Sequence, residues 1–370
     1  MRKLCGRWFW GGDKLINAVR GMEKIQLGDS ELEISPIVFG AWAIGGWMWG
    51  GTDDKLASDA LKASFDEGVT SIDTAPVYGL GHSEKVVGDF AKEAGRENIE
   101  ILTKFGWNWE MPRGKALMKG SWPGGPEMDV YSNASKESIV YEIEKSLRRL
   151  QTDYIDLYQI HRPDPDTPIE EMMEACLQLK KDGKIRTFGV SNMSVDLMKE
   201  AEKTMPIASS QSPYSMVYRK IEKDILPHCI EQNIGILAYS PLQRGLLTGK
   251  ITSDYQFGEG DHRPRNKFFK EPNRTRANHF LEKIKPVADE HGVTLAQLVI
   301  NWTVQREGIT AALVGARNAE QARENAGAMS FNLSEEEIKT INEELNKVVI
   351  DQGVQVNYPL RRKLRKFFGR

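Results

Sequence analysis

The sequence predicts an α/β protein in which eight parallel strands close into a (β/α)8 barrel, also called a TIM barrel. Short apolar runs of the strand type occur eight times, and runs with helical periodicity separate them. The strand runs are almost continuously apolar, as expected for a parallel sheet covered by helices. In addition, no Gly-x-Gly-x-x-Gly sequence follows the first run, which disfavours an open, doubly wound sheet.

The composition is that of a soluble globular protein with a large core. Of the 370 residues, 40% are hydrophobic and 28% are charged. The net charge of -2 gives no electrostatic basis for binding nucleic acid. No apolar run reaches the roughly 18 residues that a membrane span needs. The cysteines Cys5, Cys176 and Cys229 are widely separated and fit neither a disulfide framework nor a zinc site, so we expect a cytoplasmic protein without a metal.

The chain divides into four parts. Residues 1–22 form an extension that we expect to be poorly ordered, with Met22 as an alternative start of the protein. Tryptophan and basic residues interleave in this extension, so a surface-associated amphipathic arm is the competing interpretation. Residues 23–35 predict a β-hairpin that closes the bottom of the barrel. Residues 36–332 form the barrel, and residues 333–370 form a C-terminal helix and a basic tail.

Individual elements follow from the pattern of apolar residues. Barrel strands are expected at 37–41, 70–73, 101–105, 154–160, 187–191, 208–211, 235–239 and 311–314. Among the runs between them, residues 135–150 place Ile139, Ile143 and Leu147 on one helical face. Helices are expected at 54–67, 135–150 and 169–181, with a further helix from Ser334, where Glu337 completes a capping box.

Three connections are much longer than the others. They are residues 45–53 after the first strand, 106–133 after the third and 241–275 after the seventh. All three follow the carboxyl end of a strand, and barrels of this kind carry their active sites at that face. We therefore expect the long loops to surround the functional site.

Ionisable residues stand at the ends of three successive strands. Asp73 ends the second strand, with Tyr78 in the loop behind it, Lys104 lies at the end of the third, and His161 follows the fourth. Adjacent strands lie about 4.8 Å apart, so Lys104 can supply the cation that a buried Asp73 needs. Both side chains can reach Tyr78.

This group of residues predicts proton transfer to a carbonyl oxygen. A phenol is a poor acid at neutral pH, and an adjacent ammonium lowers its pKa. Tyr78 would then act as the acid, Asp73 would hold Lys104, and His161 would orient the carbonyl. Side chains cannot supply hydride, so a nicotinamide cofactor is implied. Taken singly, each residue has an ordinary alternative: a structural ion pair for Asp73 and Lys104, a satisfied polar residue for His161, and packing for Tyr78.

Several motifs resemble the aldo-keto reductase family, in order from about residue 23 to residue 330. They are Asp73-Thr-Ala-Pro-Val-Tyr78-Gly, the strand of Lys104, Gln159-Ile-His161-Arg-Pro-Asp, Gly189-Val-Ser-Asn192, Ala238-Tyr239-Ser-Pro-Leu-Gln-Arg-Gly and Val314-Gly-Ala-Arg-Asn-Ala-Glu-Gln321. The resemblance implies that the tyrosine is the general acid, that the lysine and aspartate tune it, and that the histidine positions the carbonyl.

The resemblance also implies which residues contact the nicotinamide cofactor. Those expected at its carboxamide, ring and pyrophosphate are Ser191, Asn192, Gln211, Tyr239, Ser240, Leu242, Gly245 and Leu247. Those expected at its adenosine end are Gly315, Ala316, Arg317, Gln321 and Asn325. A helix that begins near Asn318, together with Arg317, suits a 2′-phosphate and favours NADPH. Some relatives have a lysine-serine pair where this chain has Gly315-Ala316-Arg317, so NADH stays open, and ordinary surface polarity would equally explain Gln321 and Asn325.

Tryptophans are frequent on the first strand and in the long connections after the first and third strands, and they suggest the nature of the substrate. We assign Trp42, Trp47 and Trp107 to the substrate pocket, whose aromatic walls suit an apolar or aromatic carbonyl compound. Packing of the loops against each other is the competing explanation.

The leading hypothesis is an NADPH-dependent reductase of small aldehydes or ketones. A second is a sensor or regulatory subunit that binds the same cofactor, as in channel-associated members of the family. A third is a Schiff-base enzyme with Lys104 as nucleophile, which would leave Tyr78 unexplained. The sequence indicates neither the physiological substrate nor the oligomeric state.

Overall fold

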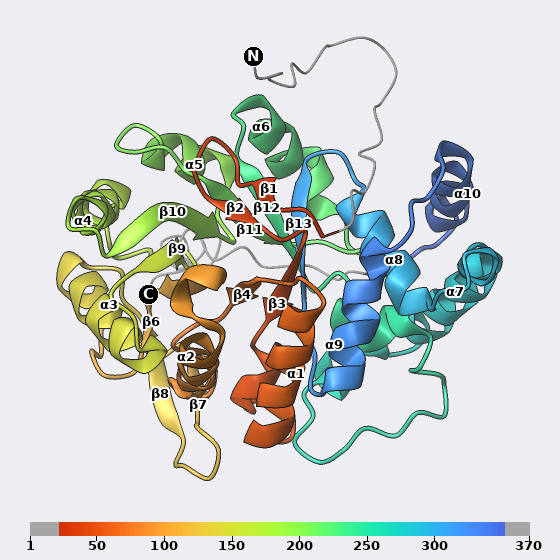
Figure 1. Ribbon diagram of the computed structural model, residues 1–370, viewed down its shortest axis with the longest axis horizontal. Coiled ribbons are helices and arrows are strands. Elements are labelled where there is room, and N and C mark those ends of the chain that lie inside the picture. Colours follow the sequence, from red (N-terminus) through yellow and green to blue (C-terminus); the bar gives the residue numbers. More distant parts are fainter. Residues whose placement is uncertain (1–21, 352–370) are drawn as a thin grey trace, which may run out of the picture.

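A computed structural model describes residues 22–351, in which eight parallel strands form one closed barrel (Figure 1). The predicted (β/α)8 fold is confirmed. Around the barrel the strands are β3 (Ile37–Gly40), β4 (Ser71–Asp73), β5 (Glu100–Phe105), β9 (Ile155–Ile160), β10 (Ile185–Ser191), β11 (Ser209–Pro213), β12 (Gly235–Tyr239) and β13 (Ile309–Val314). The extension before Met22 and the basic tail after Asp351 lie outside the described residues.

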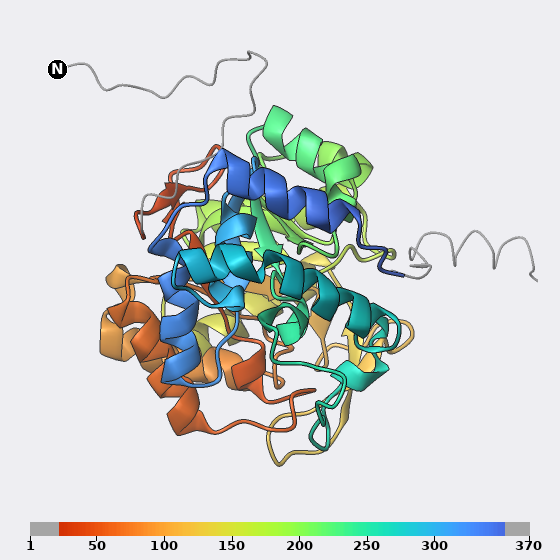
Figure 2. The same cartoon turned by 90° about the vertical axis from the view of Figure 1, so that its right-hand side faces the viewer.

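Helices surround the strands as a ring in Figure 1. They are α1 (Asp54–Asp66), α2 (His82–Ala94), α3 (Lys136–Leu150), α4 (Ile169–Lys181), α5 (Val195–Ala201), α6 (Ile225–Glu231), α7 (Asn273–Glu290), α8 (Leu295–Val304), α9 (Ala319–Ala326) and α10 (Glu335–Asn346). The helix predicted at 169–181 has these bounds, and the Ser334–Glu337 capping box before α10 is formed. In Figure 2, α7 (teal) and α10 (blue) lie side by side on the outside of the barrel. Among the described residues, none of the helices combines the length and the apolar character needed to cross a membrane.

The predicted hairpin is present and packs against the barrel strands. It consists of β1 (Ile25–Gln26) and β2 (Glu33–Ile34), which pair antiparallel. Its apolar side chains pack against inward-facing residues of the barrel strands; the members of this cluster are Leu27, Leu32, Ile34, Val38, Leu102, Leu157, Leu237, Ala311 and Leu313. Gly28 in the turn has φ +56°, and a Cβ there would lie 2.4 Å from the carbonyl oxygen of Ala208, so only glycine fits.

The three long connections emerge at the carboxyl ends of the strands. The connection after β5 folds into a small antiparallel sheet of β6 (Trp107–Asn108), β8 (Met128–Ser132) and β7 (Met118–Gly120), which the sequence did not predict. The connections after β3 and β12 touch each other: Trp49 and Asp261 form a β-bridge, and His262 Nδ1 lies 2.6 Å from the carbonyl oxygen of Met48. Two of the long loops thus meet at this face of the barrel.

Candidate active site

The parallel strands bring the ionisable residues together. Asp73 is the last residue of β4, Lys104 lies on β5, and His161 directly follows β9. These strands are neighbours, with Asp73 opposite Leu102 and Lys104 opposite Gln159. The juxtaposition predicted from the strand ends is therefore present in the structure.

Lys104 lies between a carboxylate and a phenol. Its Nζ donates to Asp73 Oδ2 at 2.6 Å and to the carbonyl oxygen of Thr74 at 2.9 Å, and it lies 3.4 Å from Tyr78 Oη. Lys104 is fully buried, Asp73 is 3% exposed, and Tyr78 is half-buried. A buried ammonium is stable here because a carboxylate and a carbonyl oxygen replace its lost water.

The second carboxylate oxygen of Asp73 is also bonded. Gln211 Nε2 donates to Asp73 Oδ1 at 2.7 Å, and Gln159 Nε2 lies 3.4 Å from the same atom. Both glutamines are buried. Side chains of β9 and β11 thus fix the aspartate in addition to Lys104, and it holds the lysine in one place.

The pKa of Tyr78 differs from the expectation. Burial of the phenol, together with the nearby Asp73 carboxylate, raises the pKa of Tyr78 well above its ordinary value. Burial lowers the pKa of Lys104, and the attraction of Asp73 opposes that change. The net pKa of Tyr78 therefore shifts in the direction opposite to the prediction, because the prediction left burial out. Tyr78 consequently keeps its proton at neutral pH, which is the form that a proton donor needs.

His161 is held as a neutral imidazole beside the phenol. Burial, with the positive charges of Lys104 and Arg162, lowers the pKa of His161 well below its ordinary value. Its ring stacks on Trp107 with centroids 4.2 Å apart, and it meets the Tyr78 ring edge-on at 5.8 Å. The neutral ring can donate one hydrogen bond to a substrate oxygen without carrying a charge.

Asp73, Tyr78 and His161 border one large cavity of about 620 Å³. Of the residues predicted from the sequence, those that line it are Trp42, Trp47, Asp73, Tyr78, Trp107, His161, Ser191, Asn192, Gln211, Tyr239, Ser240, Leu242, Gly245, Gly315, Arg317, Gln321 and Asn325. Lys104 lies behind Asp73 and Tyr78. Leu247 and Ala316 are buried in the core and do not border the cavity, whereas the other predicted cofactor contacts do.

One end of the cavity presents an aromatic ring and amide groups next to His161. Tyr239 Oη donates to Asn192 Oδ1 at 2.8 Å, and Asn192 Nδ2 donates to the carbonyl oxygen of His161 at 3.1 Å. Asn192 and Ser240 have φ of 56° and 58°, a left-handed conformation that costs energy for these residues. Both residues border the cavity, and their amide and hydroxyl groups can form hydrogen bonds with a polar group bound there.

The other end of the cavity lies at the start of α9. Asn318 caps this helix by accepting from Gln321 N at 2.9 Å, so the predicted helix start is confirmed. Gln321 Oε1 in turn accepts from Arg317 N at 2.9 Å. The Arg317 guanidinium lies 3.4 Å from the carbonyl oxygen of Gly51 and remains beside the cavity. A helix start and a guanidinium together favour an anionic group.

Four further cations border the cavity and were not predicted. They are Arg162, Arg244, Lys250 and Arg263. Lys250 pairs with Glu324 and Arg263 with Asp261, whereas no carboxylate of the described residues pairs with Arg244, whose guanidinium carbon lies 5.3 Å from the centre of the Trp42 ring. Except for Arg162, next to His161, they lie in the long connection after β12, where sequence spacing gives no indication of which side chains face inward.

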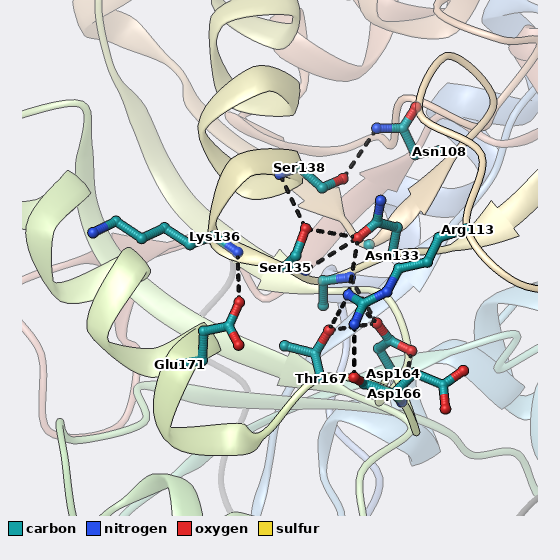
Figure 3. Close-up of polar contacts among 12 residues, drawn as sticks. Asn108, Arg113, Asn133, Ser135, Lys136, Ser138, Asp164, Asp166, Thr167 and Glu171 are labelled. Atoms are coloured by element: carbon teal, nitrogen blue, oxygen red, sulfur yellow. Dashed lines mark hydrogen bonds and ion pairs between the residues drawn. The ribbon is translucent and has the colours of Figure 1, made fainter.

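A buried polar network joins the loops after β5 and β9 (Figure 3). Asp164 Oδ2 accepts from Ala134 N at 2.9 Å and from Thr167 Oγ1 at 2.7 Å, and lies 3.7 Å from Arg113 Nη1. Arg113 Nη1 also donates to Thr167 Oγ1 at 2.8 Å. These contacts tie the loop that carries Trp107 to the loop that begins with His161. They therefore support the stacked pair of Trp107 and His161 beside the cavity.

Comparison with known proteins agrees with this arrangement. The aldo/keto reductase family model matches residues 36–346. The aldo-keto reductase YhdN of Bacillus subtilis is 38% identical over 335 residues, which cover 89% of this chain and 96% of that protein. The NADH-specific methylglyoxal reductase of Escherichia coli is 35% identical over 327 residues (87% and 98%), and a probable voltage-gated potassium channel subunit beta of Arabidopsis thaliana is 34% identical over 326 (83% and 91%).

A solved structure shows the same relationship in three dimensions. The glycerol dehydrogenase of Gluconobacter oxydans is 35% identical and superimposes with a TM-score of 0.78 over 90% of this chain and 98% of that one. The shared fold, the family match over most of the chain and the identity of these relatives agree with one another. The chain is an oxidoreductase that belongs to the aldo/keto reductase family.

Proposed function

We propose that the protein reduces a small aldehyde or ketone to an alcohol with NADPH, and that Tyr78 is the general acid. The observation that carries the proposal is the position of Lys104, between the Asp73 carboxylate and the Tyr78 hydroxyl, behind a cavity that Tyr78 borders. A phenol held beside a buried ammonium serves a reaction in which the phenol gives up its proton and the resulting phenolate must be stabilised.

Each residue of the site has a separate role in carbonyl reduction. His161, as a neutral imidazole, donates a hydrogen bond that orients the substrate oxygen. Tyr78 gives its proton to that oxygen as negative charge develops there. Lys104 stabilises the phenolate that remains, and Asp73 keeps Lys104 in place. NADPH, when bound, supplies the hydride that no side chain can provide.

The chemistry of the cavity fits a dinucleotide phosphate. Burial lowers the pKa of the Arg244 guanidinium, and no carboxylate of the described residues pairs with it. Such a cation is stabilised when a pyrophosphate lies beside it. Arg317, at the start of α9, is placed for a 2′-phosphate, which favours NADPH over NADH. The name of the Escherichia coli relative specifies NADH, so NADH is the alternative cofactor.

A regulatory role that uses the same barrel is the second candidate. Its support is the similarity to a probable potassium channel subunit beta. The complete set of Asp73, Tyr78, Lys104 and His161 supports the enzyme. A Schiff base on Lys104 is disfavoured, because its Nζ is fully buried and bonded to Asp73 and Thr74.

We also propose that the protein acts in the cytoplasm on a small molecule. Cys176 and Cys229 are free thiols in the core, which suits a reducing compartment. The proposed carbonyl reduction uses neither thiol. Burial raises the pKa of both, which keeps them unreactive.

The experiment that tests the proposal is a screen of NADPH oxidation over aldehydes, ketones and sugars, repeated with NADH. We expect turnover of at least one carbonyl class and a lower KM for NADPH than for NADH. Cofactor binding without oxidation of any member of the set would favour the regulatory role. Equal KM values for the two cofactors would mean that Arg317 does not select the phosphate.

A further inference from the structure

One cation at the reacting end of the cavity acts in the proposed reaction only through its charge, which helps to keep His161 neutral. Arg162 directly follows His161, borders the cavity and is exposed. Within residues 22–351, no carboxylate lies within ion-pair distance of its guanidinium, and the ring of Trp107 lies 5.8 Å from the guanidinium carbon. Asp164, the nearby acid of the same loop, is already bound by Ala134, Thr167 and Arg113 (Figure 3).

The position of Arg162 differs from that of the other cations. Arg244, Lys250 and Arg263 lie in the connection after β12, where Lys250 and Arg263 are paired with carboxylates and Arg244 lies over the Trp42 ring. Arg162 instead lies against Trp107, and Trp107 stacks on His161. The guanidinium, the indole and the imidazole are thus consecutive neighbours at the end where a carbonyl group would react.

The cavity lining near Arg162 is apolar. Apolar side chains border the cavity here, namely Trp47, Val77, Trp107 and Met118. A neutral apolar substrate would be bound by these groups alone and would gain nothing from a guanidinium. An arginine presents a planar pair of N–H donors that matches the two oxygens of a carboxylate or phosphate. The electron-rich face of the Trp107 ring, 5.8 Å from the guanidinium carbon, also attracts this cation.

We propose that Arg162 binds an acidic group of the substrate, so that the preferred substrates are carbonyl compounds that carry a carboxylate or a phosphate on an apolar body. This inference rests on the proposed reductase function and specifies its substrate class. The Tyr78 and His161 end of the cavity would receive the carbonyl group, while the body of the substrate lies along Trp107 and the acidic group reaches the cavity mouth at Arg162.

A set of substrates that share one aromatic body tests the proposal. The set is 4-formylbenzoate, its neutral methyl ester and 4-formylphenyl phosphate, and the readout is kcat/KM from NADPH oxidation. Arg162→Gln should lower kcat/KM for the acids about tenfold more than for the ester, the effect of one charged hydrogen-bonding pair in a partly exposed site. Arg162→Lys keeps the charge without the planar donors and should lose less. The relative loss for carboxylate and phosphate tells which anion the site prefers.

The control is Arg148→Gln, at an exposed arginine on α3 outside the cavity, which should leave the acid-to-ester ratio unchanged. Equal losses for the acids and the ester in Arg162→Gln would overturn the proposal and mean that Arg162 acts only through Trp107.

A binding measurement separates this result from failure of the reaction itself. The affinity for the product 4-(hydroxymethyl)benzoate, measured by calorimetry, should fall about tenfold in Arg162→Gln. Absence of NADPH oxidation with every compound would contradict the proposed function. Equal affinity of both proteins for this acid would contradict the role of Arg162.

Discussion

The Nζ atom of Lys104 lies 3.4 Å from the Oη atom of Tyr78, and the same nitrogen donates to Asp73 at 2.6 Å. The Lys104 ammonium therefore has two neighbours: the Asp73 carboxylate, which is always an anion, and the Tyr78 phenol, which becomes one only during the reaction. Burial raises the pKa of Tyr78, so the phenol keeps its proton before the reaction begins. The lysine contributes most when the proton has left, because its charge then faces a phenolate in a site shielded from water.

Replacement of the phenol tests the acid directly. Tyr78→Phe keeps the ring against His161 but removes the proton, so kcat should fall by about 10²- to 10⁴-fold, the usual contribution of a general acid. NADPH binding, followed by cofactor fluorescence, should persist. Tyr154→Phe, at a tyrosine whose ring lies under Arg96 and outside the cavity, serves as the control. Turnover close to that of the wild type in Tyr78→Phe would contradict the mechanism.

The ion pair behind Tyr78 affects stability and activity separately. Lys104→Met leaves the buried Asp73 carboxylate without its cation, which should lower the free energy of unfolding by about 3–5 kcal/mol. Adding Asp73→Asn removes the uncompensated charge while keeping contacts to Gln211.

The double variant should therefore recover much of the stability and none of the turnover. Chemical denaturation and NADPH oxidation measure the two effects. Recovery of turnover in the double variant would mean that Tyr78 needs no adjacent ammonium.

The preference for NADPH depends on Arg317. Arg317→Ala removes the guanidinium at the start of α9, so the dissociation constant for NADPH should rise by roughly tenfold and that for NADH much less. Arg323→Ala is the matched control, because Arg323 is exposed on the same helix and does not border the cavity. Fluorescence titration with both cofactors gives the constants. A similar loss for NADH and NADPH would show that this arginine does not recognise the 2′-phosphate.

The sequence predicted the barrel and its strand-end residues well, because both depend on local patterns. An apolar strand that ends in Asp73 or Lys104 must place that residue at the carboxyl face once the sheet is parallel. Strand β12 has the predicted bounds, and the other strands differ at their ends by a few residues at most. The hairpin was likewise predictable, since the turn at Gly28 joins two short runs of alternating polarity.

Long-range contacts were not predictable in the same way. The sheet of β6, β7 and β8 has short strands whose pairing depends on the fold of the whole connection. Burial of Tyr78 is a tertiary property, so the direction of its pKa shift could not be read from its spacing to Lys104. Which way Arg244 points depends on a left-handed backbone, with φ 57°, which a non-glycine residue rarely adopts.

A second buried carboxyl group gives a pH-dependent prediction. Glu142 on α3 accepts from Gly106 N at 3.1 Å and from Ser138 Oγ at 3.0 Å, and burial raises its pKa to about 8. In the unfolded chain its pKa is near the ordinary value of about 4.3. Between these two values the folded protein holds a proton that the unfolded chain has lost. Stability contributed by this group therefore falls as the pH rises through that window and is constant above it.

Glu142→Gln removes this dependence while keeping an acceptor for Gly106 and Ser138. The melting temperature of the variant minus that of the wild type should rise steadily from pH 5 to pH 8, then level off. Glu137→Gln, at an exposed glutamate in the first turn of the same helix, controls for the loss of one negative charge. Melting curves in matched ionic strength measure both differences. A difference for Glu142→Gln that stays constant over this range would mean that the buried carboxyl group is already ionised at pH 5, with its cost met by Gly106, Ser138 and the positive charge of Arg149.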